Sequence, residues 1–162
     1  MKNYQKQLNN SDIIVKKILL SEVRRNKQLL NNLIDYIYNY FYEFEDIKLN
    51  KIKLAKILLT KFKDKNNLYF IIKKNNSNIG MVHTYISNKY VDLCLIYLDK
   101  QFRDQGIGIK VIKYLKKYFK KKLSKTRRQF FRIEIKVDNF YSHKFFKKLK
   151  AKTKSIIYLL KI

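Results

Sequence analysis

The chain has 162 residues, 46% of them hydrophobic, so it can bury one substantial core and gives no sign of a second domain. It carries 38 Lys and Arg against 12 Asp and Glu, a formal net charge of +26, with two histidines and one cysteine, Cys94. These counts exclude an internal disulfide and predict no metal site, while the lack of a long apolar run and the polar first residues predict neither a membrane span nor a signal peptide. We expect one domain, residues 1–162, in the cytoplasm as a monomer or homodimer, with Cys94 as a small buried apolar side chain.

The first third of the chain is predicted to be mainly helical. The apolar run 13–19 predicts a first strand. Apolar residues then recur with helical spacing from Ser21, a residue suited to a helix N-cap, as far as Phe41, and again over residues 50–63. These spacings predict two helices after the first strand.

Three strands are predicted next. Segments 68–73, 79–86 and 90–98 are apolar and rich in β-branched and aromatic residues, and short polar turns separate them. This pattern predicts a three-stranded antiparallel meander.

The C-terminal half alternates helix and strand. Apolar side chains share one face of a predicted helix at 106–122, while its lysines lie elsewhere. A strand at 129–137, a helix at 139–150 and a closing strand at 155–161 follow. The predicted order is therefore β-α-α-β-β-β-α-β-α-β.

The junction between the strand at 90–98 and the helix at 106–122 holds Gly106 and Gly108, two of the three glycines in the chain. Glycine lets main-chain N–H groups approach a ligand closely, and the start of a helix presents unpaired N–H donors at the positive end of its dipole. With Arg103 just before it, this junction predicts a phosphate-binding site. Its spacing matches neither a P-loop nor a dinucleotide-binding motif.

Two segments and the order of elements together resemble the GNAT superfamily of N-acetyltransferases. The segments are Arg103–Gly108 (RDQGIG) and Ile133–Asn139 (IEIKVDN), and the resemblance spans most of the chain. It implies an α/β (α+β) GNAT fold, with a central, mixed, mostly antiparallel twisted sheet of six to seven strands flanked by about four helices. It also implies an N-acetyltransferase with acetyl-CoA as donor and no metal.

The resemblance further implies where acetyl-CoA binds. In the family, an Arg/Gln-x-x-Gly-x-Gly/Ala signature wraps the pyrophosphate, and Arg103, Gly106 and Gly108 stand at its defining positions. The pantetheine arm is expected along the preceding strand, and Asn139 is suited both to contact the cofactor and to cap the last helix. The implied cofactor-binding residues are Tyr97, Leu98, Arg103, Asp104, Gln105, Gly106, Ile107, Gly108, Ile109, Asn139 and Phe146.

Acetyl transfer to an amine needs a base, because a primary amine with a pKa of about 10 is mostly protonated at neutral pH. Two carboxylates in predicted strands are candidates. Asp92 resembles the acidic residue that histone-type members use, and Glu134 resembles the glutamate of ribosomal-protein N-terminal acetyltransferases; we favour Glu134 slightly. The alternative for each is a solvent-facing charge paired with a nearby lysine and without a catalytic role.

Phe146 departs from the family pattern, which usually has a tyrosine there to protonate the sulfur of coenzyme A. A thiol of pKa about 8.5 can leave as a thiolate at a cost of about 2 kcal/mol, so we expect less dependence on an acid rather than inactivity. Tyr97 and Tyr141 are alternative acids. The departure also keeps open a second function: a coenzyme A-binding protein with little turnover that binds RNA or an acidic partner through its basic C-terminal half.

The charge bears on the partners of the chain. Residues 101–162 carry 20 Lys or Arg against 3 Asp or Glu, most densely over 116–128, a pattern suited to nucleic acid or an acidic surface. Abundant Lys, Asn and Ile without Pro or Trp is also what an AT-rich genome imposes. Positive charge disfavours cationic acceptors such as polyamines and aminoglycosides, and favours a protein or peptide amine, such as one at the ribosome, or an acceptor attached to RNA.

Overall fold

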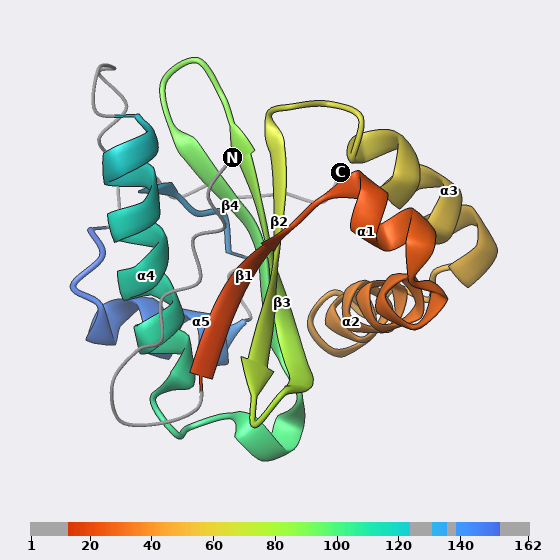
Figure 1. Ribbon diagram of the computed structural model, residues 1–162. Helices are drawn as coiled ribbons and strands as arrows, with labels where there is room; N and C mark the ends of the chain where they lie inside the picture. Colours follow the sequence, from red (N-terminus) through yellow and green to blue (C-terminus); the bar gives the residue numbers. More distant parts are fainter. Residues whose placement is uncertain (1–12, 124–130, 136–138, 153–162) are drawn as a thin grey trace, which may run out of the picture.

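A computed structural model of the protein describes residues 13–123, 131–135 and 139–152. Within them, one sheet has the strand order β1-β2-β3-β4-β5, antiparallel throughout except that β5 runs parallel to β4 (Figure 1). The strands are β1 (Ile13–Ile18), β2 (Asn67–Lys74), β3 (Ser77–Ile86), β4 (Val91–Leu98) and β5 (Phe131–Arg132). The mixed, mostly antiparallel sheet is confirmed, with five described strands rather than the expected six to seven. The predicted strand at 155–161 lies outside the described residues.

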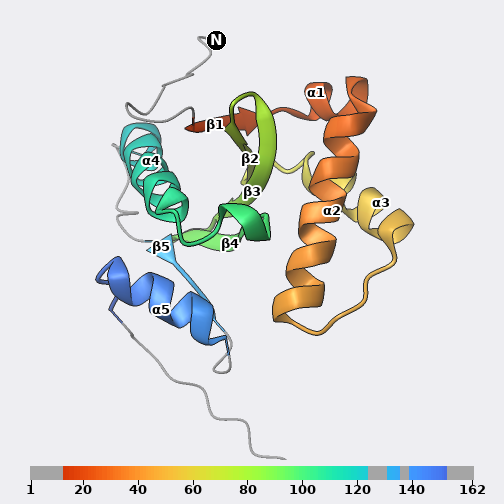
Figure 2. The same cartoon turned by 90° about the horizontal axis from the view of Figure 1, so that it is seen from below.

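Helices cover both faces of the sheet (Figures 1 and 2). One layer consists of α1 (Leu20–Arg25), α2 (Lys27–Phe44) and α3 (Lys51–Lys61). The other layer consists of α4 (Ile107–Lys122) and α5 (Phe140–Lys148), and the short 3-10 helix η1 (Lys100–Phe102) leads from β4 toward α4. None of the described helices combines the length and the apolar character needed to cross a membrane.

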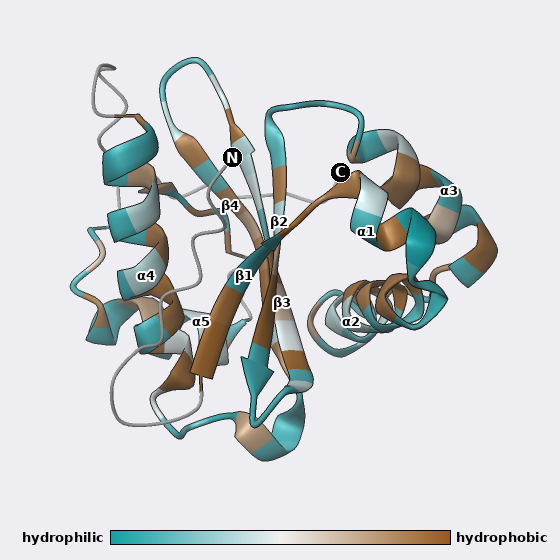
Figure 3. Ribbon diagram, viewed as in Figure 1, coloured by the Kyte–Doolittle hydropathy of each residue, from teal (hydrophilic) through white to brown (hydrophobic). Residues whose placement is uncertain are grey.

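The strand β2 shows why the sheet is buried on both faces. Phe70 packs in a core that includes residues of α4, whereas its neighbours Tyr69 and Ile71 pack in a second core with residues of α2 and α3. Because successive side chains of a strand point to opposite faces, a strand between two helical layers reads as a continuous apolar run. The hydropathy colouring shows this apolar centre between more polar outer surfaces (Figure 3).

The first predicted helix is interrupted at Asn26. This residue has an extended backbone (φ −124°, ψ 94°), and its side chain accepts a hydrogen bond from Leu29 N. Asn26 therefore ends α1 and caps α2, because asparagine satisfies an otherwise unpaired N–H at a helix start. The prediction of a continuous helix from Ser21 to Phe41 was wrong at this point.

The predicted strand at 129–137 is much shorter where it is described. Only Phe131 and Arg132 pair with β4, opposite Val91 and Asp92. Residues 133–135 form no strand, although Ile133 and Ile135 still pack against the core. The apolar alternation was read correctly as a buried face, but residues 133–135 do not pair with β4.

Candidate active site

The turn between β4 and α4 has left-handed backbone at Asp104 and Gly106, with φ of 58° and 72°. Gly106 is the N-cap of α4, and a Cβ there would meet no atom within 4 Å, so its conformation rather than crowding favours glycine. The first helical hydrogen bond runs from Lys110 N to Gly106 O (3.2 Å). The N–H groups of residues 107–109 therefore have no partner within the helix. The turn presents an open row of main-chain donors at the positive end of α4.

Side chains of the turn hold its shape. Gln105 donates through Nε2 to Gln101 O (2.7 Å), and its Oε1 accepts a hydrogen bond from Lys74 Nζ on β2 (3.3 Å). Lys74 Nζ also lies 5.4 Å from the centroid of the Phe102 ring. These contacts fasten the turn to the end of β2.

Gly108 allows α5 to approach the start of α4. A Cβ at this position would lie 2.9 Å from Cε2 of Phe145, closer than such contacts occur. Phe146, the next residue, is buried in the core on the α4 side of the sheet. Asn139 caps α5, since its Oδ1 accepts a hydrogen bond from Ser142 N (3.0 Å). The cap predicted at Asn139 is therefore present.

Strand β4 has an open edge beside this turn. It pairs with β5 only at Val91 and Asp92, so the described residues provide no ladder partner along 93–98 on that side. Its register with β3 shifts at Cys94, which faces no partner residue and is exposed. The prediction that Cys94 is buried was wrong, because this bulge turns it out of the regular alternation.

Arg103 points toward α2. Its Nε donates to Leu98 O (2.8 Å), and its Nη1 lies 2.8 Å from Oε2 of Glu43. Its guanidinium carbon is 5.4 Å from the ring centroid of Phe44 and 5.1 Å from that of Tyr97. Nη2 is buried and has no hydrogen-bond partner in the described part of the chain. Arg103 thus links the start of the turn to the end of α2.

Glu43, which the sequence did not single out, joins three elements. Besides Arg103, it accepts a hydrogen bond from the hydroxyl of Tyr97 on β4 (Oη to Oε1, 2.9 Å). Burial, followed by this hydrogen bond, raises the pKa of Tyr97 to about 12. Burial also raises the pKa of Asp99, an effect that Arg103 opposes. The phenol of Tyr97 is therefore protonated at neutral pH and directed at Glu43.

The two candidate bases lie on either side of Arg132. Asp92 is 13% exposed and lies 2.5 Å from Nε of Arg132, whose pKa it raises. Glu134 is 84% exposed, and its carboxylate is 3.8 Å from Nη1 of the same arginine. Glu134 follows β5 instead of lying inside a strand as predicted. The structure thus brings both carboxylates to one arginine, a residue that the sequence did not single out.

His83 lies on β3, on the side of the sheet that faces α3. Its ring stacks on Tyr69 (centroids 4.4 Å apart, planes within 7°), and Nε2 is 2.8 Å from Asn67 Oδ1. Burial, with a smaller contribution from Lys61, lowers its pKa to about 4. His83 is therefore a neutral, structurally engaged side chain at pH 7.

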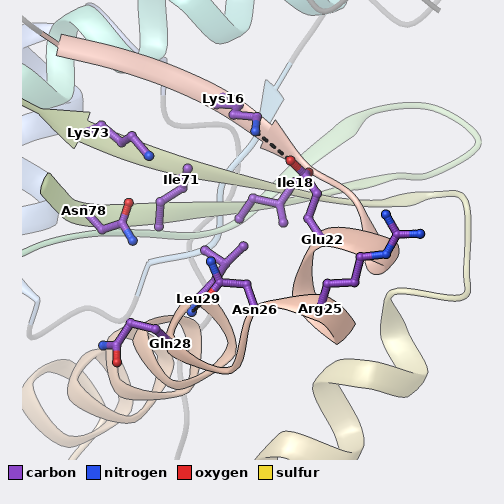
Figure 4. A pocket seen from close by; sticks show the side chains of 10 residues that line it. All are labelled: Lys16, Ile18, Glu22, Arg25, Asn26, Gln28, Leu29, Ile71, Lys73 and Asn78. Atoms are coloured by element: carbon purple, nitrogen blue, oxygen red, sulfur yellow. Dashed lines mark hydrogen bonds and ion pairs between the residues drawn. The ribbon is translucent and has the colours of Figure 1, made fainter. Parts of the chain in front are cut away.

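One cavity of about 370 Å³ lies apart from these residues, between β1, β2 and the junction of α1 with α2 (Figure 4). Lys16, Arg25 and Lys73 line it, and Glu22 accepts a hydrogen bond from Lys16 Nζ (2.6 Å). None of the predicted site residues lines this cavity. In the described segments, no cluster of three or more His, Cys, Asp or Glu side chains could hold a metal ion.

Comparison with known proteins decides the family. The model of the acetyltransferase (GNAT) family matches residues 27–150. The chain belongs to this family. The resemblance seen in the sequence is confirmed, and the chain is an N-acetyltransferase of the GNAT class, whose members use acetyl-CoA.

Solved structures with this fold include three informative ones. A possible acetyltransferase from Clostridium difficile 630 aligns with a TM-score of 0.67 and 16% identity over 93% of this chain and 97% of that one. The aminoglycoside N-acetyltransferase AAC(6')-Iy in complex with CoA gives 0.69 and 15% over 96% and 99%. The ribosomal-protein-alanine N-acetyltransferase of Brucella melitensis biovar Abortus 2308 gives 0.67 and 13% over 93% and 99%. No curated protein shows significant sequence similarity. At these identities the structural likeness establishes the fold.

Proposed function

We propose that the chain transfers the acetyl group of acetyl-CoA to a primary amine of a protein or peptide, with a side-chain carboxylate as base. One juxtaposition carries the proposal: the row of N–H donors at 107–109 lies next to the edge of β4 that has no ladder partner among the described residues. Such donors at a helix start suit a pyrophosphate, and an open strand edge suits an extended chain of amide groups. When bound, acetyl-CoA supplies a thioester carbonyl that an amine can attack.

The main chain does most of the cofactor binding in this proposal. The N–H groups of residues 104–109 would hold the pyrophosphate, and the edge groups of Tyr97 and Leu98 would hold the pantetheine arm. A main-chain N–H of this edge would also meet the negative charge that develops on the attacked carbonyl oxygen. Asn139 and Phe146 would close the site from α5. Arg103 would act by positioning the turn, since its guanidinium is engaged with Leu98 and Glu43.

Glu134 remains the favoured base, with Asp92 as the alternative. The amine must lose a proton, directly or through water, before it attacks. Glu134 is open to solvent and 3.8 Å from Arg132, so it can accept that proton without breaking a close contact. Asp92 would have to give up its short ion pair with Arg132. The exposure and the looser pairing of Glu134 support this order.

The thiolate would leave without a side-chain acid. Phe146 has no hydroxyl and is buried, Tyr97 donates to Glu43, and Tyr141 is 80% exposed. A free thiol has a pKa of about 8.5, so departure as thiolate at pH 7 costs about 2 kcal/mol. The lack of a side-chain acid among these residues also favours the second candidate function, a coenzyme A-binding protein with little turnover.

The acceptor class follows from charge. With a net charge of +26, the protein repels polycationic amines more than peptide amines. The structural neighbours include aminoglycoside acetyltransferases and a ribosomal-protein-alanine N-acetyltransferase. The charge favours a protein amine over an aminoglycoside as the acceptor for this chain.

Release of free thiol from acetyl-CoA tests the proposal, with a panel of N-terminal peptide amines, lysine peptides, an aminoglycoside and a polyamine. We expect turnover with peptide amines. Preference for the aminoglycoside would contradict the acceptor class, and coenzyme A binding without release of thiol with any amine would favour the second function.

Calorimetric titration with coenzyme A tests separately whether the main-chain N–H groups of the turn bind the cofactor. Gly106→Val places a β-branched residue at φ 72°, and we expect at least about tenfold weaker binding because the donors of the turn are displaced. Asp46→Val, at another residue with positive φ (52°) outside the turn, is the matched control. Equally tight binding of coenzyme A by wild type and Gly106→Val would refute a role of this turn in cofactor binding.

A further inference from the structure

The two helical layers of the protein differ in charge. Helices α4 and α5 carry ten lysines and no Asp or Glu. Helices α1, α2 and α3 carry seven Lys or Arg together with three Asp or Glu. The layers lie on opposite sides of the sheet, so the excess charge is concentrated on one side of the molecule (Figures 1 and 2).

Codon composition does not account for this asymmetry. An AT-rich genome would enrich lysine in both layers, and both layers do contain it. It gives no reason for acidic residues to be present in one layer and absent from the other. The absence of Asp and Glu from α4 and α5 is therefore a property of that surface.

The lysines lie on the outer face of their helices. On α4 the buried side chains include Val111, Leu115 and Phe119, whereas Lys113, Lys116 and Lys120 are exposed. These three lysines follow helical spacing, with about 4.5 and 6 Å of rise between them. On α5, residues 144, 147 and 148 are exposed lysines as well.

Binding of acetyl-CoA does not require the far end of this face. Lys120 lies 11 residues after Ile109, a rise of about 16 Å along the helix. At physiological ionic strength exposed charges are screened over about 8 Å. Lys116 and Lys120 therefore contribute little to holding a pyrophosphate at the start of α4.

We propose that this lysine face, formed by Lys113, Lys116, Lys120, Lys144, Lys147 and Lys148, docks the phosphate backbone of RNA without reading its sequence. Protein–protein interfaces are poor in lysine and rich in aromatic residues and arginine, whereas lysine serves as a point charge for phosphate. The face has lysine without arginine, which favours a nucleic acid over a folded protein. The choice of RNA rests on the proposed function, because an acceptor amine on a ribosomal protein would be surrounded by ribosomal RNA.

The test measures fluorescence anisotropy of a labelled, mixed-sequence RNA of about 20 nucleotides with the full chain over a range of salt concentrations. The variant is Lys113→Gln/Lys116→Gln/Lys120→Gln. The control, Lys53→Gln/Lys56→Gln/Lys63→Gln, removes the same charge from exposed lysines on and after α3. Glutamine and lysine have similar helix propensity, so the fold is retained in both.

We expect the α4 variant to bind RNA at least about tenfold more weakly at physiological salt, and its log–log salt slope to be shallower by about 2. The control should stay within about twofold of wild type. Equal losses in both variants would show diffuse attraction and overturn the proposal. Polyglutamate competing as well as RNA at equal charge would overturn the proposal and point to an acidic protein partner instead.

Turnover with a short peptide amine separates this inference from the proposed function. These lysines lie outside the proposed cofactor and base residues, so thiol release should be unchanged in both variants. Loss of RNA binding with full turnover supports the docking face. RNA binding by a protein without turnover would refute the proposed enzyme activity and leave the docking face standing.

Discussion

Two arginine–carboxylate pairs flank strand β4, and they differ in their surroundings. Near its C-terminal end, Glu43 (15% exposed) and Arg103 (28% exposed) are shared among α2, β4 and the turn before α4. At its N-terminal end, Arg132 is 52% exposed and contacts a second carboxylate besides Asp92. The first pair has other polar contacts that fix it, whereas the second can exchange partners in water. The same chemical pair thus serves as a brace in one place and as an adjustable contact in the other.

The largest expected effect concerns Glu134, which lies beside the more exposed pair of Arg132 and Asp92. Glu134→Gln should lower turnover by about 10² to 10⁴, because a general base contributes that much to proton transfer. Thiol release at saturating acetyl-CoA measures it, with coenzyme A binding as the control for folding. If Asp92→Asn abolished turnover while Glu134→Gln did not, the base would be Asp92 and the ion pair would be the reactive contact.

At the brace, Glu43→Ala should lower the free energy of unfolding by about 2 to 4 kcal/mol, since it leaves the guanidinium of Arg103 poorly solvated and unpaired. Asp35→Ala is the matched control, because Asp35 and Lys51 form an ion pair with about half of each side chain exposed. It should cost about 0.5 kcal/mol or less. Urea unfolding of both variants compares them, and similar losses would contradict a special role for Glu43.

The pH dependence of stability tests His83 separately from the two arginine–carboxylate pairs. Its pKa is lowered to about 4, so the unfolded chain binds a proton near pH 6.5 before the folded one does. Stability should therefore fall as pH decreases from 6.5 to 5, by about 1 to 2 kcal/mol, a window above the usual pKa of carboxyl groups. His83→Gln should flatten this dependence. An unchanged slope in that variant would assign the loss to other groups.

The smallest effect is expected for Arg132→Gln. Half of the Arg132 side chain is exposed, so water can replace much of its contact with Asp92, and the loss of unfolding free energy should be well below that of Glu43→Ala. Urea unfolding measures it beside Glu43→Ala. A loss as large as that of Glu43→Ala would erase the distinction between brace and adjustable contact.

Local patterns in the sequence predicted most of the fold. The meander, the helix α4 that follows the glycine turn and the N-cap at Asn139 follow from spacing and capping, which are local properties. The break at Asn26 was missed because apolar spacing was weighed above a capping residue. The strand at 129–137 was overextended because alternation records burial but does not show whether a neighbouring strand is within reach.

Long-range contacts explain what the sequence left out of the site. The signature turn was found because its glycines lie within three positions of each other. Glu43 precedes Arg103 by 60 residues, and Asp92 precedes Arg132 by 40, so no spacing rule links either pair. Their significance appears only once α2 and β5 are placed beside β4.

The bulge at Cys94 sets which helical layer the later side chains of β4 face. Before it, Val91 and Leu93 face the α4 side, and after it Leu95 and Tyr97 face the α2 side. A strand of the same length without the bulge would alternate regularly through position 94, and every later side chain would turn to the opposite face. The phenol of Tyr97 would then leave Glu43 for the opposite layer. The extra residue at position 94 therefore determines that Tyr97 lies on the same side of the sheet as Glu43.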